Sequence, residues 1–372
     1  MILENFKLER YFGQYEFKTK YLFSSFDCDG YSLKYILNHA SPEELKLWDS
    51  LTLGYTESEG NPRLREIISR LYQKITPNNI IVSSPGEANF ILMNILLKPT
   101  DHVICISPSY QSLYQVVKAI GCELSYWHPD KKNWHYNPLH LQELVKKNTK
   151  LIIINFPHNP TGAFTTRKEL IKIVEIAKKN DIYLFSDEMY HLLTLQNTKE
   201  IPCICDIYER GISLWGMAKT FGLAGLRMGW LACRNKELLK NVLSYKDYLS
   251  ICSSAPSEIL SLIAINHKEG FIAPNLVKIQ ENIYLLDKFK SEHKDFIDFV
   301  PPKAGSTCFA SLNIPESTYE FCQKLIERKG ILLVPSEIFE YGSGYVRIGF
   351  GRKNFPEILE VFHDYIKKYY NK

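Results

Sequence analysis

Two cations stand in an otherwise apolar stretch of the chain, residues 211–233. Lys219 and Arg227 lie eight positions apart among apolar residues and glycines. A single lysine is usually a solvated surface residue, but an apolar setting lowers the pKa of the amine and makes it a better nucleophile toward a carbonyl. The fork of Arg227 suits an anionic group such as phosphate. An imine-forming lysine beside a phosphate-binding arginine indicates the chemistry of pyridoxal phosphate.

Short β-rich runs alternate with helical patterns through the middle of the chain. Strands are expected near residues 80–83, 103–107, 124–127, 151–155, 182–186, 212–215 and 228–233. Helices are expected between them at 88–97, 112–120, 139–147 and 167–179. This alternation predicts an α/β fold whose large domain holds a mostly parallel seven-stranded sheet covered by helices. Ligands bind at the carboxyl ends of the strands in such sheets.

Four of the expected strands are followed by residues that could meet a ligand: Tyr110, Asn159, Asp187 with Tyr190, and Lys219. Each has a structural explanation when taken alone. Asn159-Pro160-Thr161-Gly162 reads as a turn, and Asp187 could cap a helix. Tyr110 could be a core aromatic, and Arg227 could form a surface ion pair. Their joint arrangement at one sheet edge favours a single ligand chemistry.

Pyridoxal phosphate needs several of these side chains at its ring. A buried aspartate such as Asp187 keeps the ring nitrogen protonated by its charge. Tyr190 and Asn159 can donate hydrogen bonds to the phenolate oxygen of the ring. Tyr110 can stack on its face. Lys219, Asp187 and Tyr110 are therefore the expected catalytic set.

The phosphate needs a helix N-terminus and a cation. The turn after strand 80–83 opens a helix, and Pro85 has no amide hydrogen to donate. Gly86 and Glu87 are thus the expected backbone donors, with Arg227 as the cation.

The chain resembles the fold-type I pyridoxal-phosphate enzymes of the class I/II aminotransferase family. Several motifs carry the resemblance over most of the chain: Tyr55 with Gly60-x-x-x-Leu64-Arg65, Pro108-x-Tyr110, Asn159-Pro160-Thr161-Gly162, Asp187-x-x-Tyr190, Lys219 with Arg227, and Tyr345-Val346-Arg347-Ile348. Many relatives have a serine three residues before the lysine, where this chain has Gly216. The usual glycine after Pro335 is replaced by Ser336.

The resemblance implies roles that spacing alone does not. Lys219 would hold the cofactor as an imine and move a proton between the substrate α-carbon and the cofactor. Arg347, with Asn159, would bind the substrate α-carboxylate. Tyr55 would reach the phosphate held by a neighbouring subunit, which implies a homodimer with shared active sites. The reaction would move an amino group between an L-amino acid and a 2-oxo acid.

Both ends of the chain are expected to form a second, smaller α/β domain. Its expected strands are 307–312, 331–334 and 345–348, with helices at 319–329 and 355–369. An amphipathic stretch at 257–289 could carry the chain between the domains. The expected division is 46–262 for the large cofactor-binding domain, and 1–45 with 263–372 for the small one.

Bulk composition argues against several classes of protein. The net charge of +4 from 45 basic and 41 acidic residues is too small to imply nucleic-acid binding without a clustered patch. The nine cysteines contain no Cys-x-x-Cys pair, so a metal site is not expected, and free thiols suit a reducing cytoplasm. No run reaches the ~18 apolar residues of a membrane helix. A cytoplasmic protein is expected.

Other readings stay open. The same cofactor could act on a substrate side chain by cyclisation, elimination or oxidation. Segments 8–12, 155–160 and 246–250 give a narrower resemblance to capreomycidine synthases, family members that cyclise a hydroxylated arginine. A non-catalytic regulator would be expected to carry a fused DNA-binding domain, for which the chain leaves no length. A nicotinamide dehydrogenase lacks support, because no Gly-x-Gly-x-x-Gly follows the first strand. Side-chain specificity is expected to depend on loop 24–30 and the residues around Tyr248.

Overall fold

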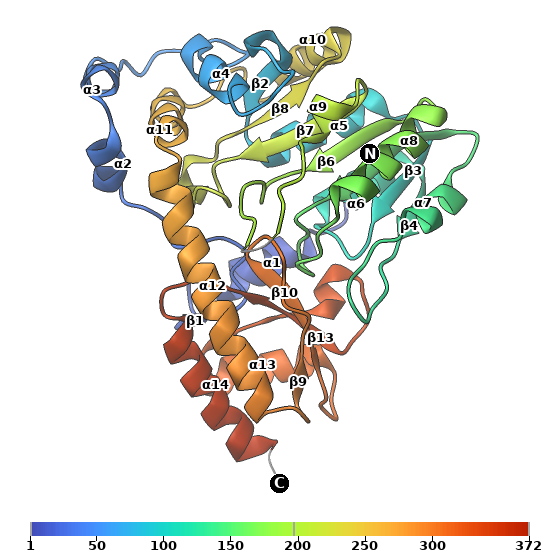
Figure 1. The fold of residues 1–372 in the computed structure, drawn as a ribbon, viewed down its shortest axis with the longest axis vertical. Helices are drawn as coiled ribbons and strands as arrows, with labels where there is room; N and C mark the ends of the chain where they lie inside the picture. The colour runs from blue at the N-terminus through green and yellow to red at the C-terminus, as the bar shows by residue number, and fades with distance from the viewer. Residues whose placement is uncertain (1, 196–197, 371–372) are drawn as a thin grey trace.

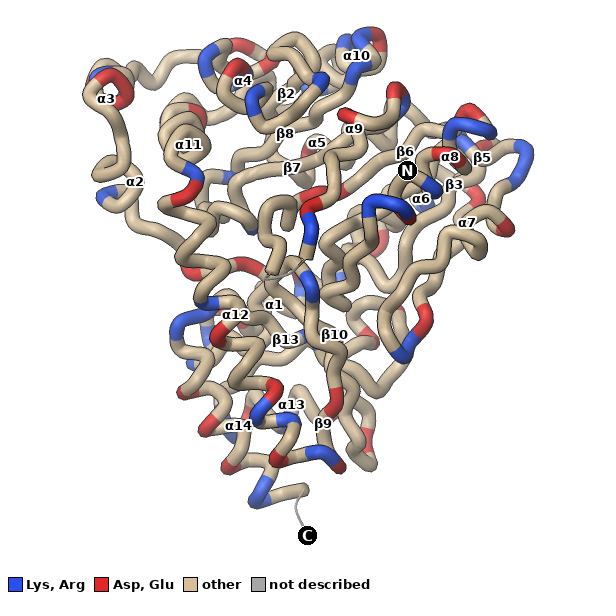
Figure 2. The backbone as a smooth tube through the Cα atoms, in the orientation of Figure 1, with Lys and Arg blue, Asp and Glu red and all other residues tan. Residues whose placement is uncertain are grey.

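The computed structural model describes residues 2–195 and 198–370. A broad upper part contains the large sheet and a tapering lower part ends at the C-terminus, while the N-terminus is marked over the upper part (Figure 1). Basic and acidic residues are interspersed along the backbone (Figure 2).

The large sheet has the strand order β2-β8-β7-β6-β5-β3-β4. Only β8 runs antiparallel to its neighbours, so the predicted seven-stranded, mostly parallel sheet is confirmed. The central strands are buried on both faces, as their Ile-rich and Leu-rich sequences require. The strand bounds are β2 Ile80–Ser83, β3 His102–Ile106, β4 Glu123–Trp127, β5 Thr149–Asn155, β6 Tyr183–Asp187, β7 Gly211–Gly216 and β8 Gly229–Cys233.

Helices cover both faces of this sheet. Successive residues of β3 enter different apolar clusters: Val103 packs in the cluster with α5 and α6, and Ile104 in the cluster with α8. This is the period-two alternation of a strand with two buried faces. The helices of this part are α5 Pro85–Leu96, α6 Ser112–Ile120, α7 Pro138–Leu144, α8 Arg167–Lys179, α9 Ile204–Ile207 and α10 Lys236–Lys246.

The smaller domain is built from both chain ends, as predicted. Strand β1 (Tyr21–Leu22) pairs in parallel with β11 (Ile331–Leu332), and the Tyr11 hydroxyl donates to the Leu333 carbonyl at 3.0 Å. A second sheet has the order β12-β13-β10-β9. The remaining bounds are α1 Lys7–Tyr15, β9 Ile297–Asp298, β10 Thr307–Leu312, α13 Thr318–Lys329, β12 Val334–Pro335, β13 Tyr345–Gly349 and α14 Phe355–Tyr369.

The predicted amphipathic stretch 257–289 is two helices, α11 (Ala255–Asn266) and α12 (Glu269–Glu292). The long α12 runs from the upper part into the lower one (Figure 1). Three helices stand on the same side of the upper part: α2 Leu33–His39, α3 Pro42–Asp49 and α4 Pro62–Ser69. Glu44 of α3 accepts a hydrogen bond from Asn266 at the end of α11 (2.6 Å). The domain boundaries at 45/46 and 262/263 stay a prediction.

Two glycines bring the start of α5 directly against strands β7 and β8. Gly216 faces Gly229 across this pair. A Cβ at Gly216 would lie 2.7 Å from the Met228 carbonyl oxygen, and a Cβ at Gly229 would lie 2.7 Å from Pro85 Cγ. A side chain at position 216 therefore requires the backbone to shift, which gives a steric reason for glycine here.

We predict that Gly216→Ala lowers the free energy of unfolding by about 1–3 kcal/mol, because the methyl group overpacks a backbone contact. Urea denaturation measures this change. Gly13→Ala is the matched control: Gly13 lies inside α1 with open space around it, so alanine should leave stability unchanged or raise it by up to ~1 kcal/mol. Equal stability of the two variants would contradict the steric account.

Candidate active site

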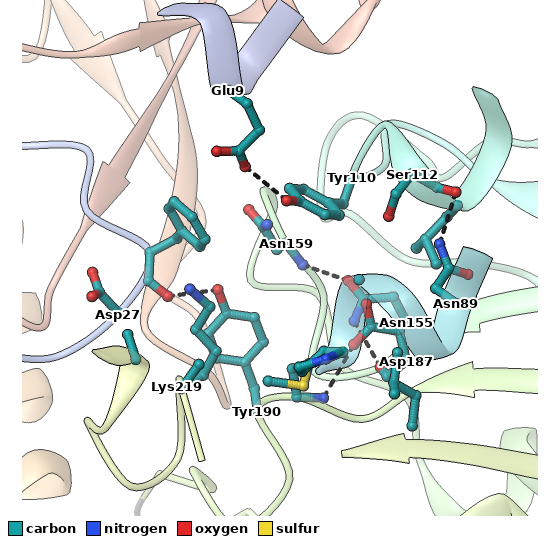
Figure 3. Close-up of a pocket in the computed structure, with 18 of the residues that line it drawn as sticks. Glu9, Asp27, Asn89, Tyr110, Ser112, Asn155, Asn159, Asp187, Tyr190 and Lys219 are labelled. Carbon is teal, nitrogen blue, oxygen red and sulfur yellow. Dashed lines mark hydrogen bonds between the residues drawn. The ribbon is translucent and has the colours of Figure 1, made fainter. Parts of the chain in front are cut away.

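A cavity of about 350 Å³ lies between the carboxyl ends of the large sheet and the N-terminal segment (Figure 3). Its volume is in the range of small-molecule sites. Most of the predicted site residues line it: Gly86, Tyr110, Asn159, Asp187, Tyr190, Lys219 and Arg227. Glu87, Arg347 and Tyr55 do not line it.

Lys219 follows β7, enters the cavity and is partly buried. Its Nζ lies 3.5 Å from the centre of the Phe26 ring. Burial lowers the pKa of Lys219 to about 8, although the nearby carboxylates of Asp27 and Glu9 oppose that shift. The amine is thus partly deprotonated near neutral pH, which is what a nucleophile or a proton carrier needs.

Asp187 stands at the end of β6, on the same side of the cavity as Asn155. Its Oδ1 accepts a hydrogen bond from the Met189 amide at 3.2 Å, and its backbone carbonyl accepts one from Asn155 Nδ2 at 2.8 Å. Burial raises the pKa of Asp187 to about 6. No cation within the described residues forms an ion pair with it. Such a carboxylate is stabilised by a positively charged group placed against it, so it fits a protonated ring nitrogen.

The start of α5 and Arg227 both line the cavity. The N-cap residue Ser84 makes no side-chain capping bond, so it leaves the amides of Gly86 and Glu87 available to an anion. The Glu87 side chain is engaged elsewhere, accepting from Ser83 Oγ at 2.7 Å. Arg227 is exposed, has a left-handed φ of 53°, and donates to the Ala224 carbonyl at 3.1 Å. These donors suit a phosphate group.

The two tyrosines of the cavity are already hydrogen-bonded. The Tyr190 hydroxyl donates to the Phe26 carbonyl at 2.7 Å, and the Tyr110 hydroxyl donates to Glu9 Oε1 at 2.7 Å. Asn159 accepts from Arg347 through Oδ1, and its backbone amide donates to Asn155 Oδ1 at 2.9 Å. Its Nδ2 therefore stays available as a donor on the cavity side.

Arg347 lies on β13, fully buried directly behind the cavity. Its Nη1 donates to Asn159 Oδ1 at 3.0 Å, and its Nε and Nη2 donate to the Ser24 carbonyl. Burial lowers the pKa of Arg347 to about 10. In the described chain no carboxylate pairs with it. A buried cation without a counter-charge is costly, so this guanidinium is suited to receive an anion from a ligand.

The Phe26 ring lies between the two cations. Its centre is 3.5 Å from Lys219 Nζ and 4.5 Å from Arg347 Cζ. A carboxylate bound to Arg347 beside Lys219 therefore requires this ring to move.

Tyr55 lies outside the cavity and is 88% exposed. Its loop is joined to the loop after α10 by Lys246, whose Nζ donates to the carbonyls of Ser58 (2.7 Å) and Ile251 (3.0 Å). Several large apolar side chains are exposed on these two joined loops: Leu53, Tyr55, Tyr248, Leu249 and Ile251.

Several cavity residues were not predicted from the sequence: Glu9, Phe12, Glu16, Asn89 and Asn155. Phe26 and Asp27 also line the cavity and were not singled out within their loop. Loop 24–30 was expected to affect specificity, and it supplies Phe26 and Asp27. Asn89 lies one helical turn after Gly86, so helical spacing could have identified it. Nothing in the local pattern of α1 indicates that Glu9 and Glu16 face a sheet edge far along the chain.

No helix in the described part of the chain is long and apolar enough to cross a membrane.

Comparison with known proteins places the chain in a family. A family model described as "Aminotransferase class I and II" matches residues 19–361. Capreomycidine synthase of Streptomyces vinaceus is 26% identical over 82% of this chain and 81% of its own. An aspartate aminotransferase of Pyrococcus horikoshii is 28% identical over 80% of this chain and 78% of its own. The crystal structure of a PLP-dependent aminotransferase from Streptococcus suis matches with a TM-score of 0.93 and 29% identity, covering 100% of both chains. The chain belongs to the aminotransferase class I and II family of pyridoxal-phosphate enzymes.

Proposed function

We propose that this protein moves an amino group between an L-amino acid and a 2-oxo acid. The observation that carries the proposal is one cavity that combines a desolvated lysine, Lys219, with the unpaired carboxylate of Asp187 and an uncapped helix N-terminus. Arg347 adds a buried cation next to that cavity. The charges of these groups are complementary to those of an amino-acid substrate and its cofactor, which supports the proposal.

Different residues of the cavity would bind different parts of pyridoxal phosphate. When bound, this cofactor supplies a carbonyl that captures amines and a ring that withdraws electrons from the attached carbon. Asp187 would hold the positive charge at the ring nitrogen. The amides of Gly86 and Glu87, with Arg227, would hold the phosphate. Tyr110 would lie against the ring face.

Lys219 and Arg347 would act on the substrate. The pKa of Lys219, near 8, lets its amine take a proton from the substrate α-carbon and return it in the same active site. Arg347 can present a two-pronged contact to the α-carboxylate once Phe26 has moved, and Asn159 Oδ1 orients the guanidinium. Tyr190 could release the Phe26 carbonyl in the same rearrangement and donate to the cofactor's phenolate oxygen.

We further propose a homodimer. The exposed Tyr55 and the apolar side chains of the two loops joined by Lys246 form a surface suited to a second copy of the chain. Tyr55 does not line its own cavity, and we assign it to the phosphate site of that copy instead. The cysteines are all free, which supports a reducing compartment such as the cytoplasm.

A second candidate function uses the same cofactor for a different reaction: cyclisation, elimination or oxidation at the substrate side chain. The similarity to capreomycidine synthase over 82% of the chain favours keeping it. Both candidates use Lys219 in the same place.

We predict that the purified holoenzyme interconverts the aldehyde and amine forms of its cofactor. A suitable L-amino acid should change the absorbance of the bound cofactor, and a 2-oxo acid should restore it. Mass spectrometry should find the 2-oxo acid derived from the amino-acid donor. A product with an altered side chain and no amine form of the cofactor would favour the second candidate. No response to any amino acid would contradict both.

We predict that Arg347→Met lowers kcat/KM for the amino acid by roughly 30-fold or more, because removing one partner of a buried charge pair costs about 2–5 kcal/mol. Cofactor absorbance should stay unchanged. An amine that has the same side chain but lacks the α-carboxylate tests the role of Arg347. It should react equally fast with the unaltered protein and with Arg347→Met. Arg70→Met, an exposed position on the large domain, is the control. Equal losses with the amino acid and the amine would overturn the carboxylate role.

A further inference from the structure

We propose that the cavity selects an amino acid with a positively charged side chain, and that Glu9, Glu16 and Asp27 recognise that charge. The inference rests on the proposed function and identifies its substrate class.

All three carboxylates line the cavity and come from the first 27 residues of the chain. Glu9 and Glu16 lie on α1 and just after it, and Asp27 lies on the loop that follows. Figure 3 shows Glu9 reaching in from α1 toward Tyr110, and Asp27 on the other side, near Lys219. All three therefore belong to the N-terminal segment, which borders the cavity opposite the large sheet, where a substrate side chain would extend.

The other charges of the site already have partners in the proposed reaction. Asp187 serves the ring nitrogen, Arg227 the phosphate and Arg347 the substrate α-carboxylate. Lys219 holds the cofactor. No charged part of an ordinary amino acid or of the cofactor is left to pair with the three N-terminal carboxylates.

The partners of these carboxylates inside the protein are few. Glu9 accepts from the neutral hydroxyl of Tyr110 at 2.7 Å. Asp27 pairs with Arg352 at 2.9 Å. Within the described chain, Glu16 has neither a side-chain hydrogen bond nor an ion pair. Burial raises the pKa of Glu16, the like charges of Asp27 and Glu9 add to the shift, and the cations of Arg352 and Lys219 oppose it.

A cation among these groups relieves that repulsion, whereas a second anion increases it. An ammonium or guanidinium at the end of the substrate side chain supplies such a cation, and a guanidinium can also bridge two carboxylates through its several donors. The alternative is that the carboxylates only balance Lys219 and Arg347 in a general way. That alternative predicts no preference for the charge of the substrate.

The test compares substrates that differ in charge and little in shape. Holoenzyme is titrated with L-arginine and L-citrulline, with L-lysine and L-norleucine, and with L-glutamate, and the half-saturating concentration is read from cofactor absorbance. We expect at least one cationic amino acid to bind about tenfold or more tightly than its neutral counterpart, and L-glutamate to bind weakly.

Glu16→Gln tests the residue assignment, since it removes the charge and keeps the shape of an unpaired side chain. It should raise KM for the cationic substrate severalfold, leave KM for the neutral counterpart unchanged and shrink the preference. Glu4→Gln, an exposed carboxylate just before α1, should change neither value. Asp27→Asn is a second variant in case Glu16→Gln fails to fold.

The possible outcomes are distinct. Equal or tighter binding of the neutral or acidic amino acids overturns the inference and leaves the proposed function standing. A preference for cations that neither Glu16→Gln nor Asp27→Asn reduces overturns the residue assignment. Failure of all amino acids to alter the cofactor would contradict the proposed function, and the inference with it.

Discussion

Desolvation of the Lys219 amine is the interaction on which the site depends. The lysine follows β7 of the large sheet, and its Nζ lies 3.5 Å from the centre of the Phe26 ring, which comes from the N-terminal segment. The same ring covers the guanidinium of Arg347 on β13. Three segments distant in sequence meet at this amine, and burial there lowers the pKa of Lys219 to about 8. The lowered pKa of Lys219 therefore depends on the folded structure around it and not on the lysine alone.

The sheet provides the rigid half of this arrangement. Because β5, β6 and β7 are parallel, Asn155, Asp187 and the segment leading to Lys219 all emerge at one edge. Arg227 precedes the antiparallel β8 and lines the same cavity as the start of α5. Gly216 and Gly229 remove the side chains that would otherwise hold this helix away from the sheet. The close approach of α5 to the sheet therefore explains why position 216 is a glycine and not the serine that many relatives have.

Much of this was predictable from local patterns. Helices α6, α8 and α14 and strands β2 and β10 occur at the predicted residues, because apolar periodicity and flanking turns determine them. Lys219 and Asp187 were predicted to line the site because they come at or after the ends of buried strands, and both line the cavity. The break between α11 and α12 was missed, since apolar residues continue across it. Glu9, Glu16 and Asp27 were not identified individually as cavity residues, because their position depends on packing between segments far apart in the chain. Tyr55 is a different case: its predicted role needs a second subunit.

The central claim is that Lys219 carries the cofactor, and its most direct test is covalent. Holoenzyme treated with borohydride, digested and analysed by mass spectrometry should carry the reduced cofactor on the peptide that contains Lys219. Lys219→Ala should carry none, and Lys240→Ala, an exposed lysine on α10, should keep it. A reduced link that persists in Lys219→Ala, or that maps to another lysine in the unaltered protein, would contradict the account.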